Sequence, residues 1–251
     1  MSVEQSALHR SHGRPVPPDC SPYWQFYDEV ALQQMTAWLP QSPALVLDLA
    51  GAPALLPAVL AGGHRVVSVR RAGEGPLEAG PRVPQVRADV RDLAFLRSQS
   101  VDVVIAPSGA LSTCLASEVT VRQVHDVLRP GGRLLLVVDS LVLGLARLAD
   151  QGRWAELADV SHADVVLVPD ESGHITRCFR SDELVDVLVD GGLEVDWIRP
   201  RSVITPATVE RAVEQGGRAA LRTLVKTELT LAAEHQGEQG LHLVASARRP
   251  R

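Results

Sequence analysis

The chain has 251 residues, of which 45% are hydrophobic and 22% are charged, and its mean hydropathy is +0.05. This composition is typical of a soluble globular protein, and no apolar run is long enough to cross a bilayer. No signal peptide is visible in the first twenty residues. We therefore expect one large cytoplasmic domain and no membrane partner.

The charge pattern and the cysteines exclude two further classes. The net charge is −5, and the arginines are scattered and often close to Asp or Glu, which disfavours a nucleic-acid partner. Cys20, Cys114 and Cys178 are far apart and fit isolated thiols in a reducing compartment. We expect no metal site, because His9 and His12 lie in a proline-rich tail where solvated side chains are the simpler interpretation.

Residues 1–22 have no hydrophobic period, so we expect a flexible N-terminal arm ahead of a domain over residues 23–251. The first helix is predicted from aromatic residues that recur at helical spacing between Tyr23 and Trp38, and Pro40 ends it. This aromatic stripe fits either core packing or a lid over a ligand.

Short apolar runs then alternate with helical patterns. The runs are continuous in Val and Leu, which is typical of parallel strands buried on both faces and covered by helices. Strands are predicted at residues 44–50, 64–70, 84–90 (an edge strand), 100–107, 133–140, 193–200 and 241–249.

Helices are predicted between these strands. One covers residues 53–63, and another covers 117–132, where Pro130 and two glycines close it. A third covers 181–192 with Ser181 as its N-cap. A long amphipathic helix begins near residue 205 and is interrupted around Gly216 and Gly217.

The regular alternation stops between about residues 141 and 180. A helical stretch and two short strands around a turn at residues 170–173 are expected there. We interpret this segment as a cap over the carboxyl edge of the sheet. Its Leu, Val and Trp154 side chains suit a moderately apolar small molecule, and they would equally suit a homodimer or a protein partner.

Several stretches together resemble the class I S-adenosylmethionine-dependent methyltransferases over about residues 23–249. "VLDLAGAP" stands at the first strand and its turn, "VRADVRDLAF" at the third strand, and "SVDVVIAPSGAL" at the fourth. "VHDVLRPGGRLLLVV" is the most family-like segment, and "SDELVDVLVDGGLEVDWI" and "LHLVASARRP" complete the set. The resemblance implies an α/β, Rossmann-like, seven-stranded, mostly parallel sheet with helices on both faces, an antiparallel last strand and a small cap insertion.

The resemblance also implies an S-adenosylmethionine site after the first strand, where the family has a glycine-rich turn. The site would include Asp48, Ala50, Gly51 and Ala52, but alanines replace all three glycines of the family pattern. Glycines let the backbone approach a cofactor closely, and a position that needs a positive φ would cost Ala about 1–2 kcal/mol.

A second departure lies at the end of the second strand. The family usually has an acid there that binds both ribose hydroxyls, whereas this chain has Arg70. Losing two hydrogen bonds to a charged acceptor costs about 3 kcal/mol, or about a hundredfold in affinity. Arg70 could instead favour an anionic ligand or be a surface residue without a role.

Other positions match the family better. Asp89 stands where the family's acid accepts from the adenine amino group, and Val90 stands beside the adenine ring. An acid at a strand end is equally common as a turn residue, so both interpretations stay open for Asp89. Pro107 and Ser108 would lie beside the reactive methyl group, unless they form a simple turn.

Methyl transfer depends mainly on positioning, and it needs a general base only when the acceptor must lose a proton. The candidate bases are His174 and His162 in the cap and Tyr27 on the first helix, although each could be merely structural or exposed to solvent. The leading hypothesis is methylation of a small molecule. The alternatives are a non-catalytic binding or regulatory protein that has lost the cofactor, and a fold that keeps the cofactor for another role such as cyclisation.

Overall fold

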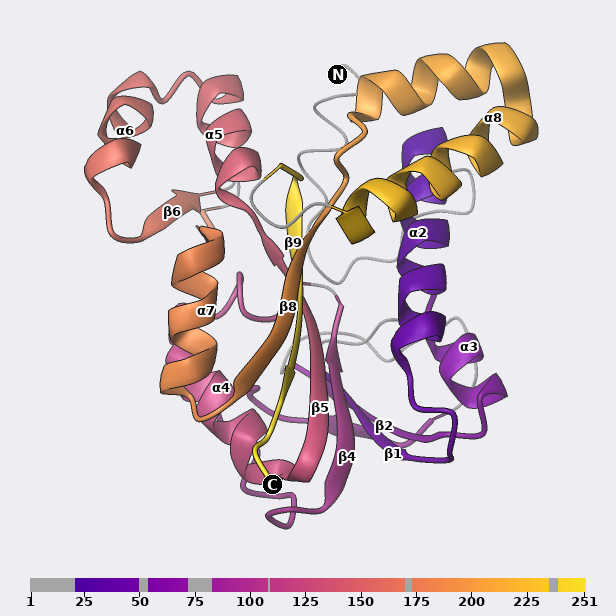
Figure 1. Ribbon diagram of the computed structural model, residues 1–251. Coiled ribbons are helices and arrows are strands. Elements are labelled where there is room, and N and C mark those ends of the chain that lie inside the picture. The colour runs from indigo at the N-terminus through magenta and orange to yellow at the C-terminus, as the bar shows by residue number, and fades with distance from the viewer. Residues whose placement is uncertain (1–20, 50–53, 72–82, 108, 170–172, 235–238) are drawn as a thin grey trace.

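A single mixed sheet forms the centre of the molecule, with helices packed on both of its faces (Figure 1). The predicted fold is therefore confirmed, while the arm expected over residues 1–22 falls almost wholly outside the described residues. The computed structural model describes residues 21–49, 54–71, 83–107, 109–169, 173–234 and 239–251.

The sheet has seven strands in the order β3-β2-β1-β4-β5-β9-β8. The first five strands in chain order run parallel, and β9 runs antiparallel to both of its neighbours, β5 and β8. The direction of strand order reverses at β1, so the crevice beyond the carboxyl ends of β1 and β4 is the usual place for a ligand. The strands are β1 (Leu45–Leu49), β2 (Arg65–Arg70), β3 (Gln85–Arg87), β4 (Val101–Ala106), β5 (Leu128–Asp139), β8 (Glu194–Arg201) and β9 (His242–Arg248).

Two apolar clusters divide the helices between the two faces of the sheet. Helices α4 and α7 pack on one face, and α2 and α3 pack on the other. None of the described helices is both long and apolar enough to span a membrane. The helices are α2 (Pro22–Trp38), α3 (Leu56–Ala61), α4 (Ser117–Val127), α5 (Leu141–Asp150), α6 (Trp154–Asp159), α7 (Ser181–Asp190) and α8 (Pro206–Glu234), with a short 3-10 helix, η1 (Val160–His162).

The aromatic stripe of α2 packs in the core. Tyr23 and Phe26 are 0% and 1% exposed and lie in one cluster with Val209 and Leu221 of α8. The structure therefore favours core packing over a lid. Helix α8 bends as predicted, because Gly217 adopts a φ of +55° that breaks the helical path.

The predicted end of α4 is wrong by five residues. The helix ends at Val127, and Leu128 already pairs with Val101 as the first residue of β5. A Cβ on Gly132 would lie 2.8 Å from the carbonyl oxygen of Arg129, so the close backbone approach in this bend needs a glycine. The long-range pairing with β4, rather than Pro130, ends the helix.

The N-cap of α7 is also one residue away from the prediction. Ser181 is the first helical residue, and Arg180 takes the cap position. The backbone N–H of Arg180 donates to the Glu183 carboxylate at 3.2 Å. One half of a capping box thus forms around an arginine in place of the expected serine.

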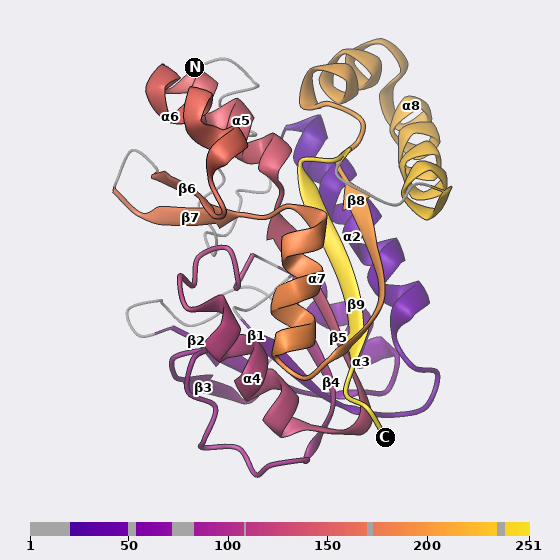
Figure 2. The same cartoon turned by 60° about the vertical axis from the view of Figure 1, so that its left-hand side comes forward.

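The expected cap lies over the carboxyl edge of the sheet and consists of α5, α6, η1 and an antiparallel hairpin, as Figure 2 shows. The hairpin strands are β6 (Val166–Pro169) and β7 (Ile175–Cys178), and residues 170–172 of the predicted turn lie outside the described residues. In Figure 2 the hairpin lies below α5 and α6 and above the first strands of the sheet.

Candidate functional site

The first predicted site residue, Asp48, is buried inside the sheet. Its side chain is fully buried, and one carboxylate oxygen accepts a hydrogen bond of 2.9 Å from the Ser68 hydroxyl. The two residues face each other in the β1–β2 register. Asp48 therefore joins the two strands just before the turn at which the cofactor is expected.

Arg70 is the last residue of β2 and is only 6% exposed. The alternative that it is a surface arginine is therefore wrong. Its neighbour Arg71 donates to the Thr113 hydroxyl at 2.5 Å, which ties the end of β2 to the loop between β4 and α4. The carboxyl end of β2 thus presents a guanidinium group where the family has a carboxylate.

Asp89 lies two residues after β3, and its side chain is 44% exposed. The carboxylate accepts from the backbone N–H of Arg91 at 2.9 Å and forms an ion pair of 2.5 Å with the same residue. The hydrogen bonds from the Arg91 side chain and backbone lower the pKa of Asp89 to about 2. Asp89 is thus a turn residue in this structure, and it remains open enough to meet a ligand.

The remaining cofactor positions divide into two groups. Val90 is 4% exposed and belongs to the main core cluster, and Pro107 is buried at the end of β4. Gly109 follows with a φ of +66°, which turns the chain into the β4–α4 loop. Ala50, Gly51, Ala52 and Ser108 lie outside the described residues.

The three candidate bases do not come together. His162 and His174 are exposed on the cap. Tyr27 is 8% exposed in α2, where its ring lies edge-on to His242 with centroids 5.3 Å apart. Among the described residues, no group of three or more His, Cys, Asp or Glu side chains could hold a metal ion.

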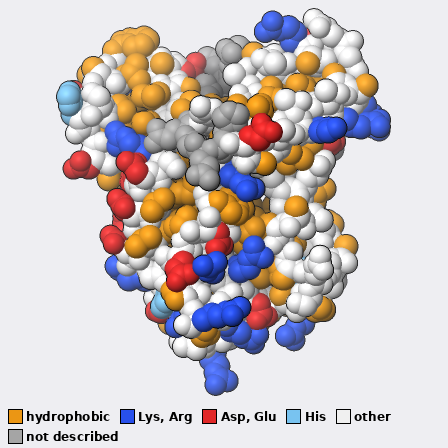
Figure 3. Space-filling model, viewed as in Figure 1, with side chains coloured by type: hydrophobic (Ala, Val, Ile, Leu, Met, Phe, Trp, Pro, Cys, Tyr) orange, Lys and Arg blue, Asp and Glu red, His pale blue; other side chains and the backbone are white. Residues whose placement is uncertain are grey.

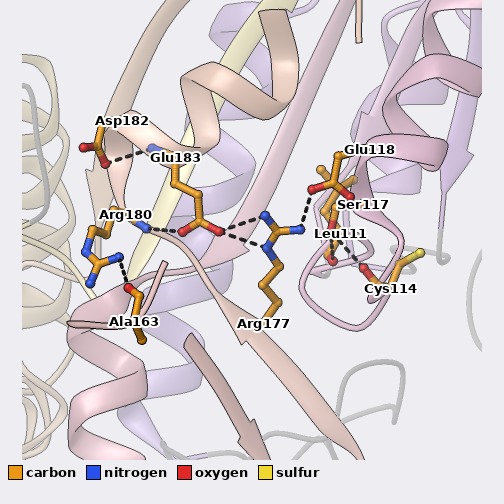
Figure 4. Close-up of polar contacts among 9 residues, drawn as sticks. All are labelled: Leu111, Cys114, Ser117, Glu118, Ala163, Arg177, Arg180, Asp182 and Glu183. Carbon is orange, nitrogen blue, oxygen red and sulfur yellow. Dashed lines mark hydrogen bonds and ion pairs between the residues drawn. The ribbon is translucent and has the colours of Figure 1, made fainter. Parts of the chain in front are cut away.

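An arginine that the sequence did not single out fastens the cap to the domain (Figure 4). Arg177 of β7 is 5% exposed and forms ion pairs of 2.8 Å with both Glu118 of α4 and Glu183 of α7. Its backbone N–H donates to the Ser112 carbonyl oxygen at 2.7 Å. Burial would lower the pKa of Arg177, but the hydrogen bonds to the two carboxylates raise it.

A second group missed by sequence reasoning lies where β5 ends. Asp139 is fully buried and forms an ion pair of 2.6 Å with Arg147 of α5, and its backbone N–H donates to the Ser112 hydroxyl. Nearby, burial and then the charge of Asp139 raise the pKa of the Cys178 thiol above its usual range. An acid directly after the apolar run of residues 134–138 was the available signal, because Asp48 likewise follows the apolar run of residues 45–47 near the end of β1.

Comparisons with known proteins agree with this arrangement. Residues 56–136 match the family model described as a methyltransferase domain. None of the curated proteins matches the chain in sequence.

Solved structures extend the likeness to most of the chain. An S-adenosylmethionine-dependent methyltransferase from Methanosarcina mazei is 18% identical, with a TM-score of 0.55, over 86% of this chain and 97% of the other. The 1,6-didemethyltoxoflavin-N1-methyltransferase of Burkholderia thailandensis was solved with S-adenosylhomocysteine. It is 20% identical, with a TM-score of 0.56, over 91% of this chain and 81% of its own. The [4+2]-cyclase SpnF is 15% identical, with a TM-score of 0.56, over 99% of this chain and 93% of its own. This chain therefore contains a segment that matches a methyltransferase domain, and it shares the fold of S-adenosylmethionine-dependent methyltransferases.

Proposed function

We propose that the chain binds S-adenosylmethionine at the carboxyl ends of β1 to β4 and methylates a small molecule held beneath the cap. The observation that carries this proposal is the conjunction of a matched methyltransferase domain with a switch point between β1 and β4. Open α/β sheets bind their ligands at such a switch point.

The described residues can hold the cofactor, with one difference: Arg70 donates hydrogen bonds where the family's acid accepts them. A ribose hydroxyl can accept as well as donate a hydrogen bond, so the Arg70 guanidinium can replace the family's acid as a partner, although as a donor only. The carboxylate of Asp89 is ionised and partly exposed, as an acceptor for an adenine amino group must be. Arg91 competes for the same carboxylate oxygens.

The chain's own contribution to methyl transfer would be positioning. The bound cofactor supplies a methyl group on a positively charged sulfur. Ser112 holds the β4–α4 loop in place, since its hydroxyl accepts from the backbone of Asp139 and its carbonyl oxygen accepts from the cap. A cap fixed in this way would orient an acceptor and exclude water from it.

The second candidate is a non-catalytic protein that has lost cofactor binding. Two observations favour it, namely the guanidinium of Arg70 at the ribose position and the ion pair that occupies Asp89. Both would weaken the affinity for the cofactor without altering the fold.

A calorimetric titration with S-adenosylhomocysteine separates the two candidates. The enzyme hypothesis predicts a dissociation constant in the micromolar range, which corresponds to a binding free energy of about −8 kcal/mol. No heat at millimolar ligand would contradict it and favour the non-catalytic protein.

A further inference from the structure

A groove runs between α2 and the second half of α8, on the opposite side of the molecule from the cap (Figure 1). Its volume is about 420 Å³. Glu29 and Gln33 line it from α2, and α8 contributes Leu229 and Val225, of which Val225 is only 2% exposed. The crossing of the two helices therefore leaves an open groove with an apolar base and polar walls.

A ridge of side chains on α8 borders this groove. Arg222, Lys226 and Thr230 are spaced four residues apart and form one i±4 row. On the other side of this row lies a second hollow of about 580 Å³, which Thr223 and Thr227 also line. Helices pack against each other by fitting such a ridge into such a groove. The surface formed by the groove and the ridge, here the α2–α8 face, thus carries both halves of a helix–helix contact.

Charges of both signs surround the groove. Glu29 and Glu234 line it as acids, and Arg222 and Lys226 line it as bases. In the part of the chain that the structure describes, none of these four charged groups forms an ion pair or a hydrogen bond. Figure 3 shows Lys and Arg side chains at the surface over α8. A two-fold axis brings the same surface of two copies together, so each copy can offer its acids to the bases of the other.

The neighbouring charges leave this balance unchanged. Helix α2 and residues 218–234 of α8 carry three further charged residues, namely Asp28, Arg218 and Glu228. Glu228 is fully buried and accepts from the backbone N–H groups of Val203 and Ile204, so it cannot reach a second copy. Three acids and three bases remain on the two helices. A partner surface that also carries both signs therefore suits this face.

We propose that the α2–α8 face is the contact surface of a two-fold symmetric homodimer, in which Glu29 of each copy pairs with Lys226 of the other. This inference goes beyond the proposed function, because neither the cap nor the carboxyl edge of the sheet takes part. Helix α2 has 17 residues and residues 218–234 match it in length, so each is about 26 Å long. Side by side they offer a flat area of about 500 Å². A stable complex buries about 800 Å² on each partner, so the dimer should be weak and reversible.

Sedimentation velocity of the full chain over a concentration series tests the proposal. We expect a dimer with a dissociation constant of about 10–100 µM. Glu29→Lys and Lys226→Glu should each raise this constant at least about tenfold, because like charges then meet across the axis. An equal mixture of the two variants should dimerise like the unmodified chain, since every introduced charge then faces its opposite. Arg211→Glu, at an exposed site in the first half of α8, is the matched control and should leave the constant within about twofold.

Lys226 allows a second measurement, because it is the only lysine in the chain. A water-soluble carbodiimide joins a lysine amine directly to a carboxylate in contact with it. We expect cross-linked dimers in which mass spectrometry finds Lys226 joined to Glu29. Lys226→Arg keeps the positive charge, so this variant should still sediment as a dimer but lose the cross-link.

Three results would overturn the proposal. They are a chain that stays monomeric up to about 200 µM, a dimer that both single charge reversals leave intact, and a mixture of the two variants that stays monomeric. Calorimetry with S-adenosylhomocysteine should give the same affinity for the charge variants and the unmodified chain. A failure of the proposed function therefore leaves this test of the dimer intact.

Discussion

The Asp89 carboxylate pairs with Arg91 in the free protein, and in the proposed complex it accepts from the adenine amino group. The Arg91 side chain and backbone hold its pKa at about 2, so the carboxylate is ionised at neutral pH. The side chain is 44% exposed, and hydrogen bonds at such positions are weakened by competing water. A ligand can therefore displace Arg91 at modest cost.

Replacing Asp89 by Ala should weaken binding of S-adenosylhomocysteine about tenfold, because a charged acceptor is lost and Arg91 is left without it. Isothermal calorimetry measures the change. The control is Asp92→Ala, since the Asp92 carboxylate accepts from the Ala94 backbone in the same exposed segment. Equal affinities for the two variants would show that the adenine lies elsewhere.

Arg70 replaces the acid that the resemblance to methyltransferases implies at the end of β2. We expect a triple variant, Ala50→Gly, Ala52→Gly and Arg70→Asp, to bind S-adenosylhomocysteine about ten to a hundred times more tightly, since both ribose hydroxyls regain a charged acceptor. The single variant Arg70→Met separates the loss of the guanidinium from the gain of the acid. If the triple variant binds no better, the affinity is limited by something other than the turn and the ribose contact.

Helices and strands of the cap depend on a few polar contacts for their position. Arg177 joins β7 to α4 and α7, and its guanidinium also lies 4.7 Å from the ring centroid of Phe179. Glu183 is 14% exposed, so an unpaired carboxylate there would be costly, whereas Glu118 at 43% is largely hydrated. The cap is therefore fastened chiefly on its α7 side.

We predict that Arg177→Met lowers the free energy of unfolding by about 2 kcal/mol, because it leaves the Glu183 charge partly buried and unpaired. Urea denaturation measures the loss, and hydrogen exchange should speed up in residues 173–180 before the rest of the sheet. Arg153→Met removes an exposed ion pair with Glu156 and should cost at most about 0.5 kcal/mol. Equal losses for the two variants would contradict a fastening role for Arg177.

The same contact predicts a dependence on pH. Burial alone would raise the pKa of Glu118, but the hydrogen bonds from Arg177 and the backbone, together with the charges of Arg177 and Arg122, outweigh it, and the pKa lies below the ordinary value of 4.5. A depressed carboxyl pKa stabilises the folded state above the ordinary value, and that contribution is lost as the pH falls through the folded-state value.

The difference in unfolding free energy between the unmodified chain and Glu118→Gln should therefore be present at pH 7 and shrink as the pH falls below the ordinary value of 4.5. Urea denaturation at a series of pH values measures it, with Glu214→Gln on the exposed side of α8 as the matched control. A difference that stays constant as the pH falls below 4.5 would mean that the ion pair does not stabilise the fold.

Across the whole molecule, the elements with strong local signals were predicted correctly. The Val and Leu runs gave all seven strands of the sheet, and the cap hairpin also forms where it was expected. The end of α4 was missed because the pairing of Leu128 with Val101 joins residues far apart in the chain. Sequence patterns read local spacing, whereas this boundary is set by the sheet.

The site was less predictable than the fold. The turn at Asp89 follows from its own neighbour Arg91, which is a local contact. The burial of Arg70 and the contacts of Arg177 arise from the packing of distant elements, so neither could be inferred from spacing. The family resemblance predicts where the rim of the site lies, whereas the polar contacts that fasten the cap to the domain came only from the three-dimensional arrangement.

The central claim is that an adenosyl group fits at the carboxyl ends of β1 to β4. A crystal structure of the chain grown with S-adenosylhomocysteine tests it most directly. We predict that the adenine amino group lies within hydrogen-bond distance of Asp89 and that the ribose lies beside Arg70. The ligand bound elsewhere, or this edge filled by the protein's own side chains at saturating ligand, would contradict the account.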